Sequence, residues 1–171
     1  QYLLDNSATV VEALKALEAI QIVMVEAHGY QANLHMAIED ATGDSAIVEY
    51  IGGKPVVHHG RQFQIMTNDP TYDEQLELLK KHDFSHPSST TPLPGNVNAS
   101  DRFQRVAYFA AILPEPKNER EAIAGAIAIA RNASVPFGIN TPDQPNISST
   151  RWRTVADHKR KLYFFESALT P

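Results

Sequence analysis

The chain has 171 residues, 43% of them hydrophobic and 20% charged, which is the composition of a globular domain and not of a disordered or fibrous protein. A formal net charge of −5 without a long basic run gives no basis for binding nucleic acid or an anionic membrane. No apolar stretch reaches the roughly 20 residues of a membrane-spanning helix. Because cysteine is absent, these residues hold no disulfide, thiolate nucleophile or cysteine-based metal site.

The first half of the chain is predicted to contain one helix followed by antiparallel strands. Apolar residues at helical spacing predict a helix over about 8–19, with Asn6 or Ser7 as its N-cap. Alternating apolar residues between turn residues then predict a series of strands. These strands cover residues 22–25, 34–39, 45–51, 54–58 and 61–67. A further helix is expected over 72–81.

The second half begins with a loop over 83–99, which is rich in Ser, Thr, Pro, Gly and Asn. Two helices and a final hairpin are predicted after it. They are a helix over about 100–113 capped by Asn98 or Ser100, a helix over 119–132, and strands over 152–157 and 162–167 that turn at 158–161. Because strands and helices are grouped and do not alternate, the pattern predicts an α+β fold with an antiparallel sheet, in a single domain over 1–171.

Histidine is the residue type that could indicate a metal site. His58 and His59 are neighbours in a predicted strand, so their side chains point to opposite faces and cannot easily bind one ion. His82 and His86 lie where a helix runs into a loop, and no carboxylate at helical spacing completes a zinc site. We therefore expect no metal and no cofactor. The common local active-site motifs for serine hydrolysis, phosphate binding and zinc proteolysis are also absent from the sequence.

Asn68 is the first candidate functional residue. It follows the strand predicted over 61–67 and precedes Asp69-Pro70, where the chain must turn. A side-chain amide held at a strand end can donate a hydrogen bond to an oxyanion that develops during hydrolysis. The alternative is a turn residue that hydrogen-bonds its own backbone, and from these residues alone the turn role is the simpler one.

Arg102 is the second candidate, because a cation in the first turn of a helix opposes the helix dipole. An external reason, such as a carboxylate partner or a role in an active site, is needed for it. The alternative is a solvated surface arginine that pairs with Asp101 or Glu115. The residues alone favour neither of these two roles.

Two longer strings carry a resemblance to a known family. They are Met66–Leu76, MTNDPTYDEQL, and Thr91–Arg105, TPLPGNVNASDRFQR. Together with Leu34–Tyr50, Ala133–Gly138 and Tyr163–Ser167, they resemble the choloylglycine hydrolase and penicillin V acylase family of N-terminal nucleophile hydrolases. The resemblance covers nearly the whole chain. The short Pro-rich connection between the two strings resembles the Gram-negative branch of the family.

The resemblance implies hydrolysis of a linear amide by an N-terminal cysteine. The thiol of that cysteine attacks the carbonyl, and its own α-amine, with an ordinary pKa of about 7.7 to 8.0, serves as the base. Asn68 matches the asparagine that contributes to the family's oxyanion hole, and Arg102 matches an arginine beside the nucleophile. A cation near a cysteine favours the thiolate, which gives such an arginine a physical reason to be there. No substrate-binding residues are assigned by the resemblance.

The nucleophile itself is not among these residues, because Gln1 has no nucleophilic side chain and no cysteine follows it. We expect the chain to be the central and C-terminal part of a larger hydrolase domain, and to be inactive alone. The nucleophile would lie upstream, in a longer chain or on a separate piece. The competing expectation is a non-catalytic fragment or degenerate family member that only binds an apolar ligand or a partner chain.

The resemblance also implies the architecture and the partners. The fold would be a partial αββα sandwich, in which antiparallel sheets are flanked by helices. The substrate would be a small amide with an apolar acyl group, of the penicillin V, conjugated bile salt or acyl homoserine lactone type. Because unpaired strand edges favour association, we expect a homo-oligomer or association with the N-terminal segment. The family places the protein in a bacterium, in the periplasm or the cytoplasm.

Overall fold

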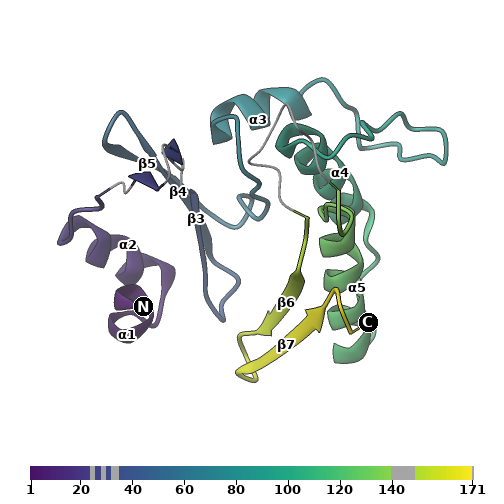
Figure 1. Ribbon diagram of the computed structural model, residues 1–171. Helices are drawn as coiled ribbons and strands as arrows, with labels where there is room; N and C mark the ends of the chain where they lie inside the picture. The colour runs from purple at the N-terminus through teal and green to yellow at the C-terminus, as the bar shows by residue number, and fades with distance from the viewer. Residues whose placement is uncertain (24–25, 28–29, 32–34, 140–148, 171) are drawn as a thin grey trace. The chain divides into compact units, whose positions relative to one another are not determined.

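The computed structural model describes residues 1–23, 26–27, 30–31, 35–139 and 149–170 (Figure 1). The chain divides into two compact units, Gln1–Thr71 and Tyr72–Pro171. Each unit combines helices with antiparallel strands, so the predicted α+β class is confirmed. The single domain over 1–171 stays a prediction. Within the residues that the structure describes, no helix is long and apolar enough to cross a membrane.

Two helices open the first unit. They are α1 (Tyr2–Asn6), which the apolar spacing does not predict, and α2 (Val10–Glu18). The N-cap of α2 is Thr9, whose Oγ1 accepts a hydrogen bond at 3.2 Å from the backbone N–H three residues further on. The predicted caps Asn6 and Ser7 are wrong, because they form the last residue and the C-cap of α1.

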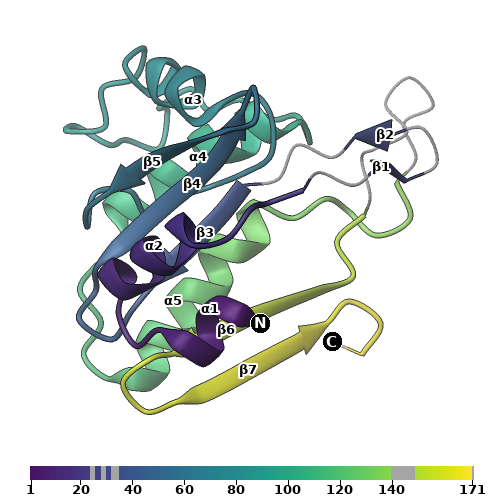
Figure 2. The same cartoon turned by 90° about the vertical axis from the view of Figure 1, so that its left-hand side faces the viewer.

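A three-stranded antiparallel sheet follows, with the strand order β3-β4-β5. Its strands are β3 (His35–Glu39), β4 (Ser45–Ile51) and β5 (Lys54–His59), which confirms the predicted strands to within one residue at each described end. The buried residues of α2 recur at helical spacing, and α2 packs against β3 (Figure 2). The apolar stripe of α2 is therefore the face that meets the sheet.

The connection between β4 and β5 is the two-residue turn Gly52-Gly53, with φ angles of 58° and 77°. Both residues of such a tight hairpin need positive φ, which glycine adopts without steric cost. A second, short antiparallel pair consists of β1 (Glu26–Ala27) and β2 (Tyr30–Gln31). Of the strand predicted over 22–25, Ile22 and Val23 are not in a strand, and 24–25 lie outside the described residues.

The strand predicted over 61–67 is wrong, since this segment is irregular. The chain leaves β5 through Gly60, and the Phe63 N–H donates back to the Gly60 carbonyl at 3.0 Å. The Phe63 carbonyl accepts a hydrogen bond from Ser45 Oγ at 2.6 Å. A turn and a side-chain hydroxyl thus form the hydrogen bonds that a neighbouring strand would form in a sheet. The alternation of apolar and polar residues does not distinguish such a segment from a strand.

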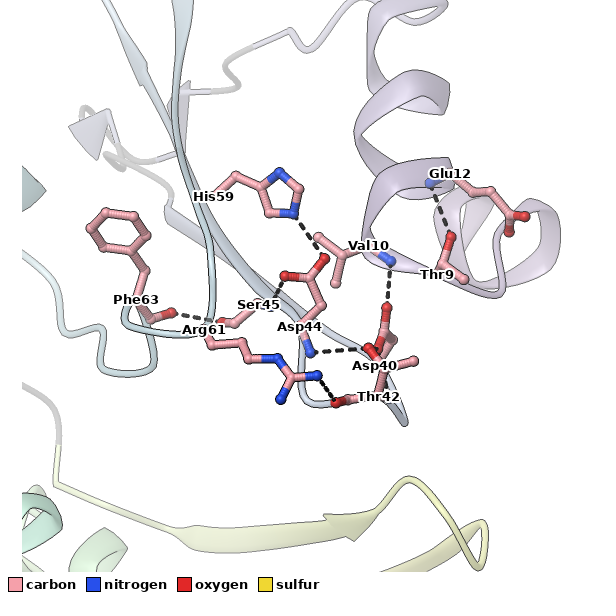
Figure 3. A network of polar contacts seen from close by, with 10 residues as sticks. All are labelled: Thr9, Val10, Glu12, Asp40, Thr42, Asp44, Ser45, His59, Arg61 and Phe63. Atoms are coloured by element: carbon pink, nitrogen blue, oxygen red, sulfur yellow. Dashed lines mark hydrogen bonds and ion pairs between the residues drawn. The ribbon is translucent and has the colours of Figure 1, made fainter.

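A polar network joins the β3–β4 turn to the start of α2 (Figure 3). Asp40 accepts hydrogen bonds from the hydroxyl and the N–H of Thr42 at 2.6 and 2.8 Å, and from the Val10 N–H at 3.0 Å. These bonds, with the Thr42 hydroxyl first, lower the pKa of Asp40 to about 2. Nearby, His59 Nε2 and Asp44 Oδ2 form a hydrogen bond of 2.8 Å.

Three helices begin the second unit. They are α3 (Tyr72–Leu79), α4 (Ala99–Ile112) and α5 (Glu119–Asn132), close to or equal to the predicted ranges. Asn98, one of the two predicted caps, is the N-cap of α4, and its Oδ1 accepts a hydrogen bond from the Asp101 N–H at 2.8 Å. The cap fixes where α4 starts and therefore where Arg102 stands.

Aromatic and small residues bring the helices of this unit together. Tyr72 of α3 and Phe103 of α4 are buried and meet edge to face, with ring centroids 5.9 Å apart. On α5, a Cβ added at Gly125 would lie 3.1 Å from a methyl carbon of Leu113. Gly125 therefore allows α5 to pack closely against Leu113.

The chain ends in the antiparallel hairpin of β6 (Trp152–Asp157) and β7 (Leu162–Ser167), with the bounds that the sequence predicts. The helix α5 packs against β6 (Figure 1). The pairing Thr154↔Phe165 and Ala156↔Tyr163 places both aromatic residues on the same face as Trp152. All three of these aromatic residues are exposed.

Candidate functional site

Asn68, the predicted oxyanion donor, belongs to the first unit and lies in the irregular segment between β5 and α3. It is exposed and begins a bend over 68–70, whereas the preceding Thr67 is buried. Asn68 therefore does not close a strand. A bend agrees with the turn role, and an exposed position agrees equally with contact to a ligand.

Arg102, the predicted cation, belongs to the second unit and lies in the first turn of α4. It is half-buried, and it donates hydrogen bonds from Nε to the Val97 carbonyl at 2.9 Å and from Nη1 to the Ala133 carbonyl at 3.5 Å. Burial lowers the pKa of the Arg102 guanidinium, and repulsion from the Arg105 charge lowers it further. Arg102 is therefore not fully solvated, and the choice between its two predicted roles stays open.

The position of Ala133 gives the Arg102 cation one favourable interaction. Ala133 is the C-cap of α5, where backbone carbonyls lack helical partners and the helix dipole is negative. The guanidinium thus opposes the dipole of its own helix, α4, but complements that of α5. This compensation lowers the cost of holding a cation half-buried at the start of α4.

A second cluster in the same unit joins α5 to the final hairpin. Glu166 of β7 accepts hydrogen bonds from Arg131 of α5 and, at 3.1 Å, from Arg153 of β6. Arg153 Nε also donates to Ser134 Oγ at 2.7 Å. The hydrogen bond from Arg131 is the largest cause of a lowered pKa of Glu166, and the charges of both arginines add to it. The cluster fixes the end of α5 against the hairpin.

Two of the hollows among the described residues lie on the second unit. One, of about 440 Å³, is lined by residues of α5, of the segment 134–137 and of both strands of the hairpin, and it includes Ser134, the neighbour of Ala133. The other, of about 490 Å³, is lined by the loop 87–93 and by Tyr108, Phe109 and Ile112 of α4. At a rise of 1.5 Å per residue, these α4 residues lie about 9 to 15 Å along the helix from Arg102. The first hollow, in contrast, includes the residue next to Ala133, whose carbonyl accepts a hydrogen bond from Arg102.

His59, His82 and His86 each have a hydrogen bond with a side chain of their own unit. His82 Nε2 and Gln104 Oε1 are 2.6 Å apart, and Gln104 Nε2 donates to the Ser100 carbonyl, so Gln104 Oε1 accepts and His82 Nε2 carries a proton. In the described ranges, no group of three or more histidine, aspartate or glutamate side chains is arranged to hold a metal ion.

Sequence reasoning missed Arg105 and the cluster of Arg131, Arg153 and Glu166. Arg153 and Glu166 are directly opposed in the hairpin register, so the predicted strands and turn could have indicated that pair. Arg105 stands three residues after Arg102 and therefore shares its helix face, which is a weak signal. Its carbonyl partners lie in two other segments of the chain, and no spacing in the sequence indicates them.

Residues 1–169 match the profile of a family described as "Linear amide C-N hydrolases, choloylglycine hydrolase family". A penicillin V acylase of Pectobacterium atrosepticum is 45% identical, over 100% of this chain and 49% of the relative. The solved structure of penicillin V acylase from Agrobacterium tumefaciens is 58% identical with a TM-score of 0.84, and it is matched over 100% of this chain and 52% of that chain.

A structure of a variant of conjugated bile acid hydrolase from Clostridium perfringens is also similar, with a TM-score of 0.73. It is 22% identical, over 95% of this chain and 56% of that chain, so the likeness concerns the fold alone. The chain spans about half the length of the relatives that it matches.

Proposed function

The chain belongs to the choloylglycine hydrolase family of linear amide C–N hydrolases, and we propose that the complete protein hydrolyses an amide bond in a small molecule. The family match over residues 1–169 carries this proposal, and the 45% and 58% identities to two penicillin V acylases support it. The resemblance stated from the sequence is confirmed. The predicted fold class, with helices flanking antiparallel sheets of the N-terminal nucleophile hydrolase type, is confirmed by the solved relatives.

We propose that the nucleophile is an N-terminal cysteine that lies outside these residues. Its thiolate would attack the amide carbonyl, its α-amine would carry the proton to the leaving nitrogen, and water would then release the acyl group. This order of steps needs two further groups: a donor for the oxyanion and a cation beside the thiolate. Asn68 and Arg102 are proposed for these two roles.

Different observations support the two assignments. Asn68 is exposed and carries a side-chain amide, which can donate a hydrogen bond to a substrate oxyanion. Arg102 is half-buried, and it donates hydrogen bonds to the backbone carbonyls of Val97 and Ala133. These carbonyls help to fix the direction of the guanidinium, as a role beside a thiolate requires.

The proposed substrate is a small amide with an apolar acyl group. Penicillin V, conjugated bile salts and acyl homoserine lactones are the candidates, and the name of the 45% identical relative favours the first. We further propose a bacterial protein, in the periplasm or the cytoplasm, that associates with copies of itself or with the N-terminal segment. The relatives from Pectobacterium and Agrobacterium support the bacterial source.

A second candidate function is binding of an apolar ligand or a partner chain without catalysis. It applies to the 171 residues taken alone, which contain no thiol for the proposed chemistry. These residues alone would then bind and not hydrolyse.

The test is an intact-mass measurement on the complete protein, followed by hydrolysis assays with one substrate of each type. We expect a species that contains these residues together with an upstream segment beginning with cysteine, and turnover of at least one substrate. Replacement of that cysteine by alanine should abolish turnover. Turnover by the 171 residues alone would contradict the proposed nucleophile, and binding without turnover by the complete protein would favour the second candidate.

A further inference from the structure

Two arginines on one face of α4 reach the same two segments of the second unit. Arg102 and Arg105 are three residues apart, so their side chains leave the helix in similar directions. One segment is 94–97, which precedes α4, and the other is the C-terminal end of α5 at 132–133. Each arginine has hydrogen bonds to both segments.

The two arginines differ in how firmly they hold these segments. Arg105 Nη1 donates to the carbonyls of Pro94 and Asn96, each at 2.8 Å, and Arg105 Nη2 donates to the Asn132 carbonyl at 3.3 Å. Arg102 contacts the next carbonyl in each segment, with a 2.9 Å bond to the 94–97 segment and a long 3.5 Å contact at the end of α5. Arg105 thus makes the bridge, and Arg102 uses acceptors that the bridge holds in place.

We propose that Arg105 is a positioning residue, which holds the 94–97 segment against the end of α5 so that the Arg102 guanidinium keeps one direction. This inference rests on the proposed function, in which Arg102 is the cation beside the nucleophile. Arg105 itself contacts backbone carbonyls and acts only through Arg102.

The electrostatic effect of Arg105 has the opposite sign, which separates geometry from charge. The positive charge of Arg105 contributes to the lowered pKa of Arg102, so it slightly disfavours the charged form of Arg102. An arginine stays protonated near neutral pH, so removing Arg105 leaves Arg102 charged. Any loss of rate in an Arg105 variant would therefore come from displacement of the guanidinium.

The fork of Arg105 is the feature that a lysine cannot reproduce. A guanidinium presents donors in a fixed plane, and here two of its nitrogens bind carbonyls of different segments. A lysine keeps the charge at one flexible point and cannot hold both segments in the same way. Arg105→Lys therefore separates the bridge from the charge, and it keeps a donor in the site if Arg105→Ala folds poorly.

The experiment compares Arg105→Ala, Arg105→Lys, Arg102→Ala and the double variant Arg102→Ala/Arg105→Ala in the complete enzyme. Arg120→Ala is the matched control, because Arg120 is an exposed arginine in the first turn of α5. The measurements are kcat, KM, the pH dependence of kcat/KM, and amide exchange over 95–97 and 132–134.

We expect Arg105→Ala and Arg105→Lys each to lower kcat about 10-fold with little change in KM, since a small displacement of a catalytic group is costly. The pH profile should move in the same direction as in Arg102→Ala, and by less. The double variant should be no slower than Arg102→Ala, because Arg105 acts only through Arg102. Amide exchange should become faster in both segments, and Arg120→Ala should match the wild type.

Additive losses in the double variant, or an unchanged pH profile with a lower melting temperature, would overturn the inference and leave Arg105 as a structural residue. The same criteria apply to Arg105→Lys and its double variant with Arg102→Ala if Arg105→Ala does not fold. Normal turnover in Arg102→Ala would instead remove the proposed role of Arg102, and the positioning role of Arg105 with it. The two failures are distinguishable, because loss of the proposed role of Arg102 is detected by normal turnover in Arg102→Ala alone.

Discussion

The first and second units use polar side chains in opposite ways. In the first unit, Asp40 accepts hydrogen bonds from a residue two positions away in the β3–β4 turn and from one residue 30 positions away, at the start of α2. In the second, arginines of α4 contact carbonyls 27 and 31 residues away. The first arrangement determines where secondary-structure elements begin and end, whereas the second holds a cation in one direction. A group of hydrogen-bonded polar side chains therefore does not by itself identify a functional site.

The largest expected effect is that of Asn68→Ala in the complete enzyme. If Asn68 donates to the oxyanion, kcat should fall by about 100- to 1000-fold while the melting temperature changes little. Steady-state kinetics and thermal unfolding measure the two quantities. Near-normal turnover together with a melting temperature several degrees lower would assign Asn68 to the turn role.

Arg102→Ala should lower kcat/KM by on the order of 100-fold, because a preorganised charge beside the reacting group is lost. The apparent pKa of the nucleophile should rise, since the thiolate loses a neighbouring cation, and the pH–rate profile should therefore move to higher pH. An unshifted profile would contradict a position of Arg102 beside the nucleophile.

The Asp40 network of the first unit and the Glu166 cluster of the second should respond differently to acid and salt. The pKa values of Asp40 and Glu166 are both lowered in the folded chain, to about 2 for Asp40. Each carboxylate therefore stabilises the fold above its unfolded pKa, near 4, and this stabilisation is lost as the pH falls through the folded value. Asp40→Asn and Glu166→Gln should each make the free energy of unfolding less dependent on pH in this range.

Salt should affect only one of these two contributions. The main causes for Asp40 are hydrogen bonds from uncharged groups, whereas those for Glu166 are two arginines. Added salt should thus reduce the difference in free energy of unfolding between the wild type and Glu166→Gln. The corresponding difference for Asp40→Asn should stay nearly unchanged. Denaturant unfolding at low and high salt measures both, and equal salt dependence would show that the networks do not differ in this respect.

The smallest expected effect comes from a helix cap. Thr9→Ala removes the hydroxyl that accepts the Glu12 N–H and should lower the free energy of unfolding by about 1 kcal/mol. Thr9→Ser should retain most of the stability, since it keeps the oxygen. An equal loss in both variants would mean that Thr9 acts by packing and not as a cap.

Features that depend on residues close together in the chain could be predicted from the sequence. The glycine turn, the Asn98 cap and the final hairpin each depend on a few neighbouring residues. The segment 61–67 was predicted wrongly because its alternation resembles a strand, while its backbone is satisfied by a turn and by Ser45.

The candidate site could be predicted only in part. The family motif indicated Asn68 and Arg102, and their proposed roles stay predictions. The surroundings of Arg102 could not be read from the sequence, because carbonyl acceptors belong to every residue and carry no compositional signal. The long-range partners of Arg105 share this property, so only the folded structure indicates them.

The aromatic face of the final hairpin has a practical consequence for spectroscopy. Trp152 is the only tryptophan among the 171 residues, and it is 59% exposed at the start of β6. In the isolated chain, tryptophan emission should therefore be red-shifted and readily quenched by acrylamide. A blue shift on adding another part of the protein would report that this face has been covered, without any introduced label.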